Sequence, residues 1–437
     1  MKCKFARTAQ LDAMLPSVSR RSFLRGSAAA TAAVTGVGIG FAPLAQAAAP
    51  TKTLVYVFLR GGNDGLSLVV PTGGVDRGFY MDARDQTRLT PDASNVDQRT
   101  LPLDAGGLWG LHPWATGLKQ LWDMNRLAIV HAAGHLAPDT HTRSHFDAQE
   151  QIELGTPGVQ ASQNGWLTRH LMSIPAVSGA VFTAMVSGQS PPTSLSGWSD
   201  VATLDSTGGF HPNPWSSYGN THMRSLRTMY AGSGDLDLSA RAAADAVELL
   251  DSLDLDNYVP GGGVTYPNTG LGDDLRLVAQ LMRLNLGIGV ATVDFGGWDT
   301  HNRQSVFGFY GNRVEELGDA LSAFYRDLAG AGRANDVAVI VQTEFGRQVT
   351  ENDDYGTDHG LGNPMFVLGG GVTGGLYGSF PGLNPSTQTI DDAVRPTTDF
   401  RQVQATVLAQ LLGNPDVEAI FDQPQSSPFT YQRMGFA

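Results

Sequence analysis

The chain is 437 residues long and carries 29 basic and 42 acidic side chains, which gives a formal net charge of −13. Its apolar fraction of 41% is enough for a large core and excludes a wholly disordered protein. The excess of acid excludes a nucleic-acid-backbone binder, because no basic stripe is available to displace counterions. The 53 glycines, about 12% of the chain against a usual ~7%, indicate many tight turns.

The first 47 residues contain the three parts of a twin-arginine (Tat) export signal. The pair Arg20-Arg21 comes first, a weakly apolar stretch rich in Ala and Gly follows over residues 26–44, and Ala45-Gln46-Ala47 is a small-x-small cleavage site. Three such features rarely occur in this order by chance. We therefore interpret residues 1–47 as a Tat signal peptide.

The rest of the chain, residues 48–437, is expected to be a single domain in the periplasm or outside the cell. Export by this route makes the Tat translocase a partner. No run of about 18 apolar residues predicts a stable membrane span. The only cysteine, Cys3, lies in the signal, so the mature chain has no thiol that could bind metal or act as a nucleophile.

The predicted signal can be tested by its cleavage and by its arginine pair. The exported protein should begin at Ala48, which N-terminal sequencing would show. Replacing Arg20 and Arg21 by Lys should leave the protein in the cytoplasm on cell fractionation, because the Arg pair is the feature that the Tat route reads. Normal export of the double variant would show that the signal is of another type.

Short apolar runs alternate with helical patterns along the mature chain, and this alternation predicts the fold class. The apolar runs, typical of strands buried on both faces, are Leu54–Leu59, Leu127–Ala132, Ala180–Val186, Ile288–Phe295, Val337–Thr343 and Met365–Leu368. The helical patterns are Trp114–Met124, Ser144–Leu154, Ser239–Leu253, Asp273–Leu286, Val314–Leu328 and Asp399–Leu412. We expect an α/β fold with a doubly wound, mainly parallel sheet, helices on both faces, and loop insertions at Ser187–Pro214 and Pro260–Gly272.

Two candidate residues follow the first two predicted strands, where ligands gather in an open parallel sheet. Asp64 ends a glycine-rich turn, where it either offers a hard oxygen to a cation or stabilises the turn itself. Ser144 opens a helix, where its hydroxyl either caps the helix or lies where the helix dipole stabilises an oxyanion. A purely capping role for Ser144 is less sufficient because five of the ten histidines lie in this part of the chain, at His112, His131, His135, His141 and His145.

Acidic and histidine side chains also lie beside the later strands. Asp299 and His301 are two residues apart in a glycine-rich strand exit, so they can reach one cation or form a hydrogen bond with each other. Glu344 directly follows the strand Val337–Thr343, and the alternative to a functional role is a salt bridge with Arg347. His359 lies shortly before the last strand. No Gly-x-Ser-x-Gly elbow is present, which argues against an α/β-hydrolase triad.

The order of these pieces resembles that of the alkaline phosphatase superfamily: an Asp after the first strand, a hydroxyl at a helix start, then Asp and His, an acid after a strand, and a late His. Within that superfamily the chain is similar to the Tat-exported bacterial family catalogued as domain of unknown function 1501. The motifs that carry this resemblance span the mature chain: Arg60-Gly-Gly-Asn-Asp64-Gly, Ser144-His-Phe-Asp147, Gly165-Trp166-Leu167, Leu277-Val-Ala-Gln280-Leu281, Gly297-Trp-Asp-Thr-His301, Thr343-Glu-Phe-Gly-Arg347 and Asp358-His-Gly360.

The superfamily resemblance implies a centre of one or two divalent ions, zinc, calcium or manganese. The implied ligands are Asp64, Ser144 and Glu344 for one ion and Asp299, His301 and His359 for the other. The resemblance also implies Ser144 as the nucleophile and makes Arg347 a candidate oxyanion partner.

Two departures from the superfamily pattern affect the expected centre. Phe345 follows Glu344, where the phosphatases have an Asp-His pair, and Asp299 and His301 are two residues apart instead of four. A site with fewer histidines has three interpretations: it holds calcium or manganese instead of two zincs, it binds a single ion, or it has lost catalysis.

Three functions are compatible with the sequence. The first is an exported metal-dependent hydrolase of phosphate or sulfate esters, with a small molecule or a polymer as substrate. The second is a non-catalytic cell-envelope binding protein that keeps the phosphatase-like fold. The third, a cofactor-dependent oxidoreductase, is suggested only by the Tat route and is disfavoured by the absence of cysteine from the mature chain.

Overall fold

The computed structural model describes residues 52–437 apart from 160–163, 178–179, 181, 189, 205–218, 235, 238–239, 242–243, 246–247, 249–256, 305–307, 389–391 and 425. The predicted signal peptide therefore lies outside the described residues, as does most of the predicted helix Ser239–Leu253. Within the part that is described, no helix combines the length and the apolar character needed to cross a membrane.

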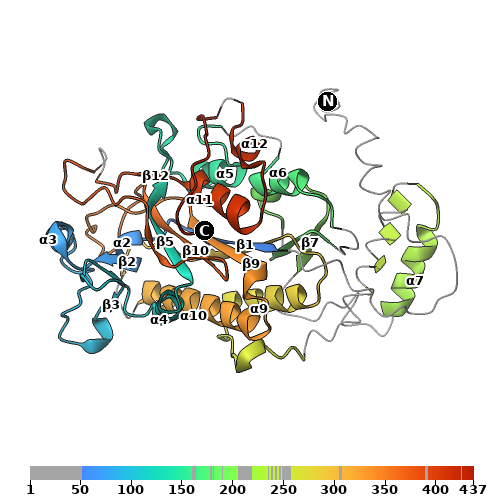
Figure 1. Cartoon of the computed structure of the whole chain (residues 1–437), viewed down its shortest axis with the longest axis horizontal. Coiled ribbons are helices and arrows are strands. Elements are labelled where there is room, and N and C mark those ends of the chain that lie inside the picture. Colours follow the sequence, from blue (N-terminus) through green and yellow to red (C-terminus); the bar gives the residue numbers. More distant parts are fainter. Residues whose placement is uncertain are drawn as a thin grey trace, which may run out of the picture. The chain divides into compact units, whose positions relative to one another are not determined.

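The described residues are organised around a nine-stranded sheet whose main path has the order β11-β5-β10-β9-β1-β8-β6-β7, with β12 paired to β5 (Figure 1). All six predicted strands are present in it. The strands of this sheet are β1 (Thr53–Arg60), β5 (Leu127–Gly134), β6 (Ala184–Ser187), β7 (Val201–Leu204), β8 (Val290–Gly296), β9 (Val337–Thr343), β10 (Asn363–Gly369), β11 (Gly375–Tyr377) and β12 (Thr398–Asp399).

The strand directions place one strand in reverse. The central strand β1 is parallel to both of its neighbours, β8 and β9, whereas β10 is antiparallel to both β9 and β5. The carboxyl ends of β1, β5, β8 and β9 therefore lie at one edge of the sheet, and the amino end of β10 lies at that same edge. A residue that precedes β10 can thus meet residues that follow the other strands.

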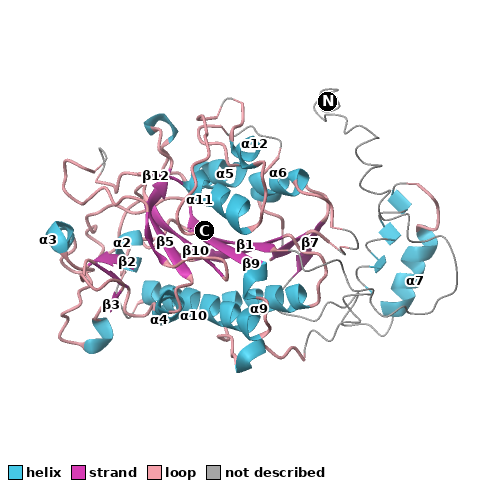
Figure 2. Cartoon of the chain, in the orientation of Figure 1, coloured by secondary structure: helices cyan, strands magenta, loops and turns pink. Residues whose placement is uncertain are grey.

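Helices cover both faces of the sheet, as predicted, because β1 buries apolar side chains on alternate sides (Figures 1 and 2). Val55 and Val57 pack in the core with α4 (Thr116–Asp123), α9 (Gly270–Arg283) and α10 (Phe309–Gly330). Leu54 and Tyr56 pack in the opposite core with α5 (His145–Leu154), α6 (Trp166–Ser173), α11 (Phe400–Thr406) and α12 (Val417–Phe421). A π-helical segment, Val407–Leu411, extends α11.

Two regions differ from the loops and connections expected from the sequence. The predicted insertion Ser187–Pro214 contains β7, which pairs in parallel with β6 and extends the sheet. Its four residues are too few to show a clear period among the surrounding Ser, Thr, Gly and Pro. The connection from β1 to α4 holds a small separate sheet with two short helices: β2 (Val69–Pro71), β3 (Leu101–Pro102), β4 (Trp109–Leu111), α2 (Gly65–Leu68) and α3 (Gly74–Ala83). Helix α7 (Gly219–Met229) follows β7 in the chain.

Candidate metal centre

Three histidines and one aspartate meet at the carboxyl edge of the sheet. His145 is the first residue of α5, Asp299 and His301 follow β8, and His359 precedes β10. An isolated antiparallel bridge between Arg347 and His359 holds the segment before β10 against the segment after β9. His359 therefore reaches the site because β10 is reversed, so a residue that precedes this strand lies at the same edge as residues that follow the others.

The imidazole Nε2 atoms of the three histidines converge on one another and on the Asp299 carboxylate. His359 Nε2 lies 3.1 Å from His145 Nε2, 2.9 Å from His301 Nε2 and 3.2 Å from Asp299 Oδ1. His301 Nε2 is 3.0 Å from the same Asp299 oxygen, and His145 Nε2 is 3.6 Å from Asp299 Oδ2. His145, Asp299 and His359 each offer a donor atom within 4.8 Å of the others, and His301 adjoins this group.

Each imidazole has an oxygen atom beside its other nitrogen. His301 Nδ1 lies 2.7 Å from Asp358 Oδ1, His359 Nδ1 lies 2.8 Å from the carbonyl oxygen of Arg143, and His145 Nδ1 lies 3.5 Å from Glu344 Oε1. For His301 and His359 this oxygen favours the tautomer with the proton on Nδ1 and the lone pair on Nε2. At His145 the Glu344 oxygen lies beside Nδ1 without a hydrogen bond of normal geometry. Arg347 Nη1 also lies 3.4 Å from His301 Nε2.

The donor set fits a divalent metal ion. Ligand bonds of ~2.0–2.1 Å in a tetrahedron put neighbouring donor atoms about 3.4 Å apart, and the distances between the Nε2 and carboxylate atoms run from 2.9 to 3.6 Å. Carboxylate or carbonyl partners on the far nitrogen are the usual second layer of a histidine metal site. Three imidazoles with one carboxylate suit zinc or another transition metal, whereas calcium prefers oxygen ligands.

The electrostatics around Asp299 keep its carboxylate ionised. Partial burial raises the pKa of Asp299, but hydrogen bonds from Arg347 and His359 outweigh that effect and lower the pKa to about 2. The Glu344 carboxylate beside His145 raises the pKa of that imidazole, while burial lowers the pKa of His359. Asp299 is therefore a permanent anion among the three imidazoles.

Arg347 supports the site from inside the protein. Its side chain has 0% exposure. Its guanidinium donates to the Asp299 carboxylate at 2.7 Å and to four carbonyl oxygens, those of Gly61, Gly62, Trp298 and Thr357. The expectation that Arg347 contacts an oxyanion does not agree with this geometry, because no face of the guanidinium is open to a ligand. The alternative prediction, a salt bridge between Arg347 and Glu344, does not agree with the structure either, because the carboxylate that pairs with Arg347 is Asp299.

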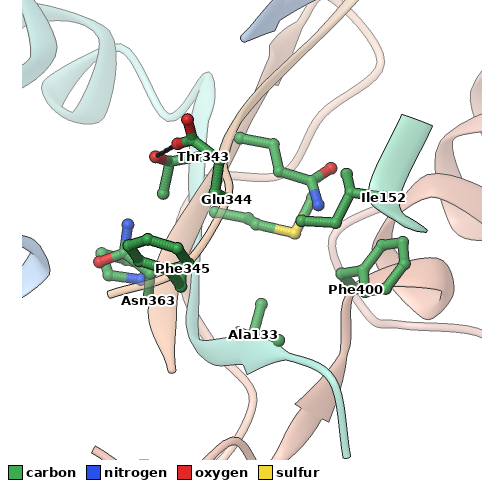
Figure 3. A pocket seen from close by; sticks show the side chains of 11 residues that line it. Ala133, Ile152, Thr343, Glu344, Phe345, Asn363 and Phe400 are labelled. Atoms are coloured by element: carbon green, nitrogen blue, oxygen red, sulfur yellow. Dashed lines mark hydrogen bonds between the residues drawn. The ribbon is translucent and has the colours of Figure 1, made fainter. Parts of the chain in front are cut away.

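Glu344 lies behind His145 and holds the turn after β1. Its carboxylate accepts hydrogen bonds from Gly61 N and Gly62 N, each at 2.8 Å, and from the Thr343 hydroxyl at 2.8 Å (Figure 3). Both glycines are required here. Gly61 has φ +123° and a Cβ would lie 2.4 Å from Asp299 N, while Gly62 has φ +67° and a Cβ would meet the Phe345 ring at 2.5 Å. The structure thus places Glu344 outside the group of converging donor atoms.

Asp64 is not brought to the centre. It is fully buried, and both of its carboxylate oxygens receive the Arg84 guanidinium, at 2.5 and 3.0 Å. Ser67 and Gln304 donate to it as well. Burial raises the pKa of Asp64, but the Arg84 charge and the hydrogen bonds from Arg84, Ser67 and Gln304 together outweigh burial and lower the pKa. The predicted ligand role of Asp64 stays a prediction, and to bind a cation its carboxylate would first have to break a buried ion pair with Arg84.

Ser144 is the N-cap of α5, as one of its two interpretations predicts. Its hydroxyl oxygen accepts from Asp147 N at 3.4 Å, and its own amide donates to the Thr142 hydroxyl. The oxygen lies at the amino end of a ten-residue helix, next in sequence to His145. No ligand role was predicted for His145, one of five neighbouring histidines, although its place directly after the N-cap was a usable signal.

Several solved structures are similar to this chain at low TM-score and low sequence identity. A protein in the alkaline phosphatase superfamily from Vibrio parahaemolyticus has a TM-score of 0.31 and 13% identity, over 90% of this chain and 74% of that one. The PsFucS1 sulfatase from Pseudoalteromonas sp. has a TM-score of 0.34 and 11% identity, over 96% and 78%. The C-terminal periplasmic domain of EcEptC from Escherichia coli, in complex with Zn, has a TM-score of 0.32 and 9% identity, over 74% and 73%. None of the curated proteins that were compared matches the chain.

Two family models match the sequence. The model of the Tat (twin-arginine translocation) pathway signal sequence matches residues 17–36, which confirms the predicted export to the periplasm or beyond. The model described as protein of unknown function (DUF1501) matches residues 129–432, a span that includes most of β5, all of α5 and every residue of the converging group. That match covers more than half of the chain, and this protein therefore belongs to the DUF1501 family.

Proposed function

We propose that this protein is an exported metal-dependent hydrolase of phosphate or sulfate esters. The observation that carries the proposal is the convergence of three imidazole Nε2 atoms on the Asp299 carboxylate at the edge of the sheet where ligands bind. Three imidazoles and one carboxylate with their donor atoms about 3 Å apart are the usual ligand set of a divalent metal ion.

His145, His301, His359 and Asp299 are the residues that would hold the ion. A divalent ion supplies Lewis-acid polarisation of an ester oxygen and lowers the pKa of a nearby hydroxyl. The chain itself orients the ligands. Asp358, Glu344 and the Arg143 carbonyl oxygen lie beside Nδ1 of His301, His145 and His359, respectively, and orient these rings. Arg347 holds the Asp299 carboxylate in place by a hydrogen bond.

Ser144 is the proposed nucleophile. The amino end of α5 favours negative charge, so an alkoxide at Ser144 Oγ would be stabilised by the amide of Asp147 and the helix dipole. Ser144 directly precedes His145, one of the residues that would hold the ion.

Replacing Ser144 by Ala separates the nucleophile from the N-cap. We expect hydrolysis of phosphate and sulfate esters to be lost, with metal content unchanged, because a nucleophile acts on the barrier more than on the ground state. The lost cap should lower the free energy of unfolding by about 0.5–2 kcal/mol. Hydrolysis of an ester panel, metal content and denaturant unfolding would be measured together.

Thr269 provides the matched control. It caps α9, where its hydroxyl accepts from Gly272 N at 3.2 Å, so Thr269→Ala should cost a similar free energy and leave activity unchanged. Equal activity in both variants would remove Ser144 from the mechanism. A wild-type protein that binds metal but hydrolyses no ester with zinc, manganese or calcium would favour the non-catalytic binding protein.

A further inference from the structure

The residues that a second ion would need are engaged in the fold. Asp64 pairs with Arg84 through both oxygens, and both Glu344 oxygens accept backbone amides of the turn after β1. The Ser144 oxygen caps α5. These are the three side chains that the superfamily pattern assigns to one of two ions, and each would have to abandon a bond of the native structure to serve one.

Phe345 closes the remaining space beside the imidazoles. Its ring lies 4.9 Å from the His145 ring and 4.8 Å from the His359 ring, centroid to centroid, and it is 4% exposed. Gly62 packs against the ring, since a Cβ at this position would lie 2.5 Å from Phe345 Cε2. An apolar ring therefore fills the position next to the ligands where a polar side chain would be required to hold another cation.

The fixed charges in contact with the ligand group leave it with a net negative charge. Asp299, Glu344 and Asp358 contribute three negative charges at or beside the imidazoles. Arg347 contributes one positive charge through its contact with Asp299. The group thus carries a net charge of −2 while its histidines are neutral, and one divalent ion brings this charge to zero.

We infer that the centre takes one divalent ion and that the loaded site favours esters with a single negative charge, such as sulfate monoesters and phosphate diesters, over doubly charged phosphate monoesters. This inference deepens the proposed function and rests on it. In an electrically neutral site, direct contact with the ion offsets the free-energy cost of desolvating one negative charge on the ester. The second negative charge of a phosphate monoester has no fixed positive partner and is repelled by Glu344 and Asp358.

Metal content tests the first half without any activity. The mature protein, purified and loaded with zinc and dialysed, should hold one ion per chain by mass spectrometry. Phe345→Ala should also hold one, because the other ligands of a second ion remain engaged. Two tightly bound ions in the wild-type chain would overturn the inference.

The charge preference is tested with three esters of p-nitrophenol: the sulfate, the bis-ester of phosphate and the phosphate monoester, all at pH 8, where the monoester is a dianion. Asp358→Asn keeps an oxygen for His301 Nδ1 and removes one negative charge. It should lower the ratio of kcat/KM for singly over doubly charged esters by about fivefold, with the metal content still one. Because the same esters are used with the wild type and with Asp358→Asn, the change in this ratio does not depend on the intrinsic reactivity of each ester.

Asp123→Asn is the matched control. Asp123 is exposed, ends α4 and precedes the amino end of β5, so it lies toward the opposite edge of the sheet; its loss should leave the ratio unchanged. An unchanged ratio in Asp358→Asn would overturn the charge preference. If none of the esters is hydrolysed, the proposed function fails while the ion count still stands. The preference is then read from calorimetric binding of methyl sulfate against methyl phosphate, and tighter binding of methyl phosphate would overturn it.

Discussion

Replacing His145 with alanine should lower the affinity for zinc by about 100-fold or more. Loss of an outer partner of a metal ligand already costs about 10–100-fold, and His145 contributes a donor atom itself, 3.1 Å from His359 Nε2 and 3.6 Å from Asp299 Oδ2. Added zinc should raise the melting temperature of the wild-type protein, since an ion that binds only the folded state stabilises it. That shift should shrink or vanish in the variant, and calorimetric titration would give the affinity.

His141→Ala is the control for this change. His141 lies in the same histidine-rich stretch, but its Nε2 faces the carbonyl oxygen of His135 at 2.8 Å and it is not part of the converging group. Its variant should bind zinc as the wild type does. Wild-type affinity in His145→Ala would remove His145 from the ligand set and leave Asp299, His301 and His359 as the only candidates.

Replacing Asp64 with asparagine should lower the free energy of unfolding by about 3–5 kcal/mol, because it leaves the Arg84 cation buried and unpaired. Arg84 is fully buried and also donates to the carbonyl oxygens of Gln348 and Val349, so the pair ties the exit of β1 to the connection between β9 and β10. Denaturant unfolding at pH 7 would measure the loss. Metal content should not change, since Asp64 is outside the ligand group.

The pH dependence of stability gives a second measure of the same pair. The folded-state pKa of Asp64 is lowered, so its contribution is fully present above the unfolded value of about 3.9 and is lost as the pH falls through the folded value. The free-energy difference between wild type and Asp64→Asn should therefore narrow only in acid.

Asp85→Asn is the matched substitution on the surface. Asp85 pairs with Arg88 and its side chain is 70% exposed, so the change should alter stability by no more than about 0.5 kcal/mol. Loss of metal in Asp64→Asn, with stability intact, would reinstate Asp64 as a ligand and contradict the geometry described above.

The strands and most helices were predictable because their information is local. Runs such as Val337–Thr343 are continuously apolar and bounded by polar residues, and the structure has β9 at the same residues. Periodicity alone reveals neither the direction of a strand nor the pairing of a short one. The reversal of β10 and the presence of β7 at the edge were therefore decided by tertiary pairing.

The site was predictable as a region and not as a ligand set. Strand exits rich in Asp, His and Gly indicated the edge of the sheet at which the converging group lies, and Asp299, His301 and His359 are in that group. Which carboxylates remain available depends on the residues that pair with them in space. Arg84 lies 20 residues from Asp64 and Arg347 lies 48 residues from Asp299. A buried guanidinium neutralises a carboxylate only when the fold brings the two together. The sequence by itself therefore determined export, fold class and the kinds of side chain at this edge of the sheet. The tertiary structure decided which of those side chains are available to bind an ion.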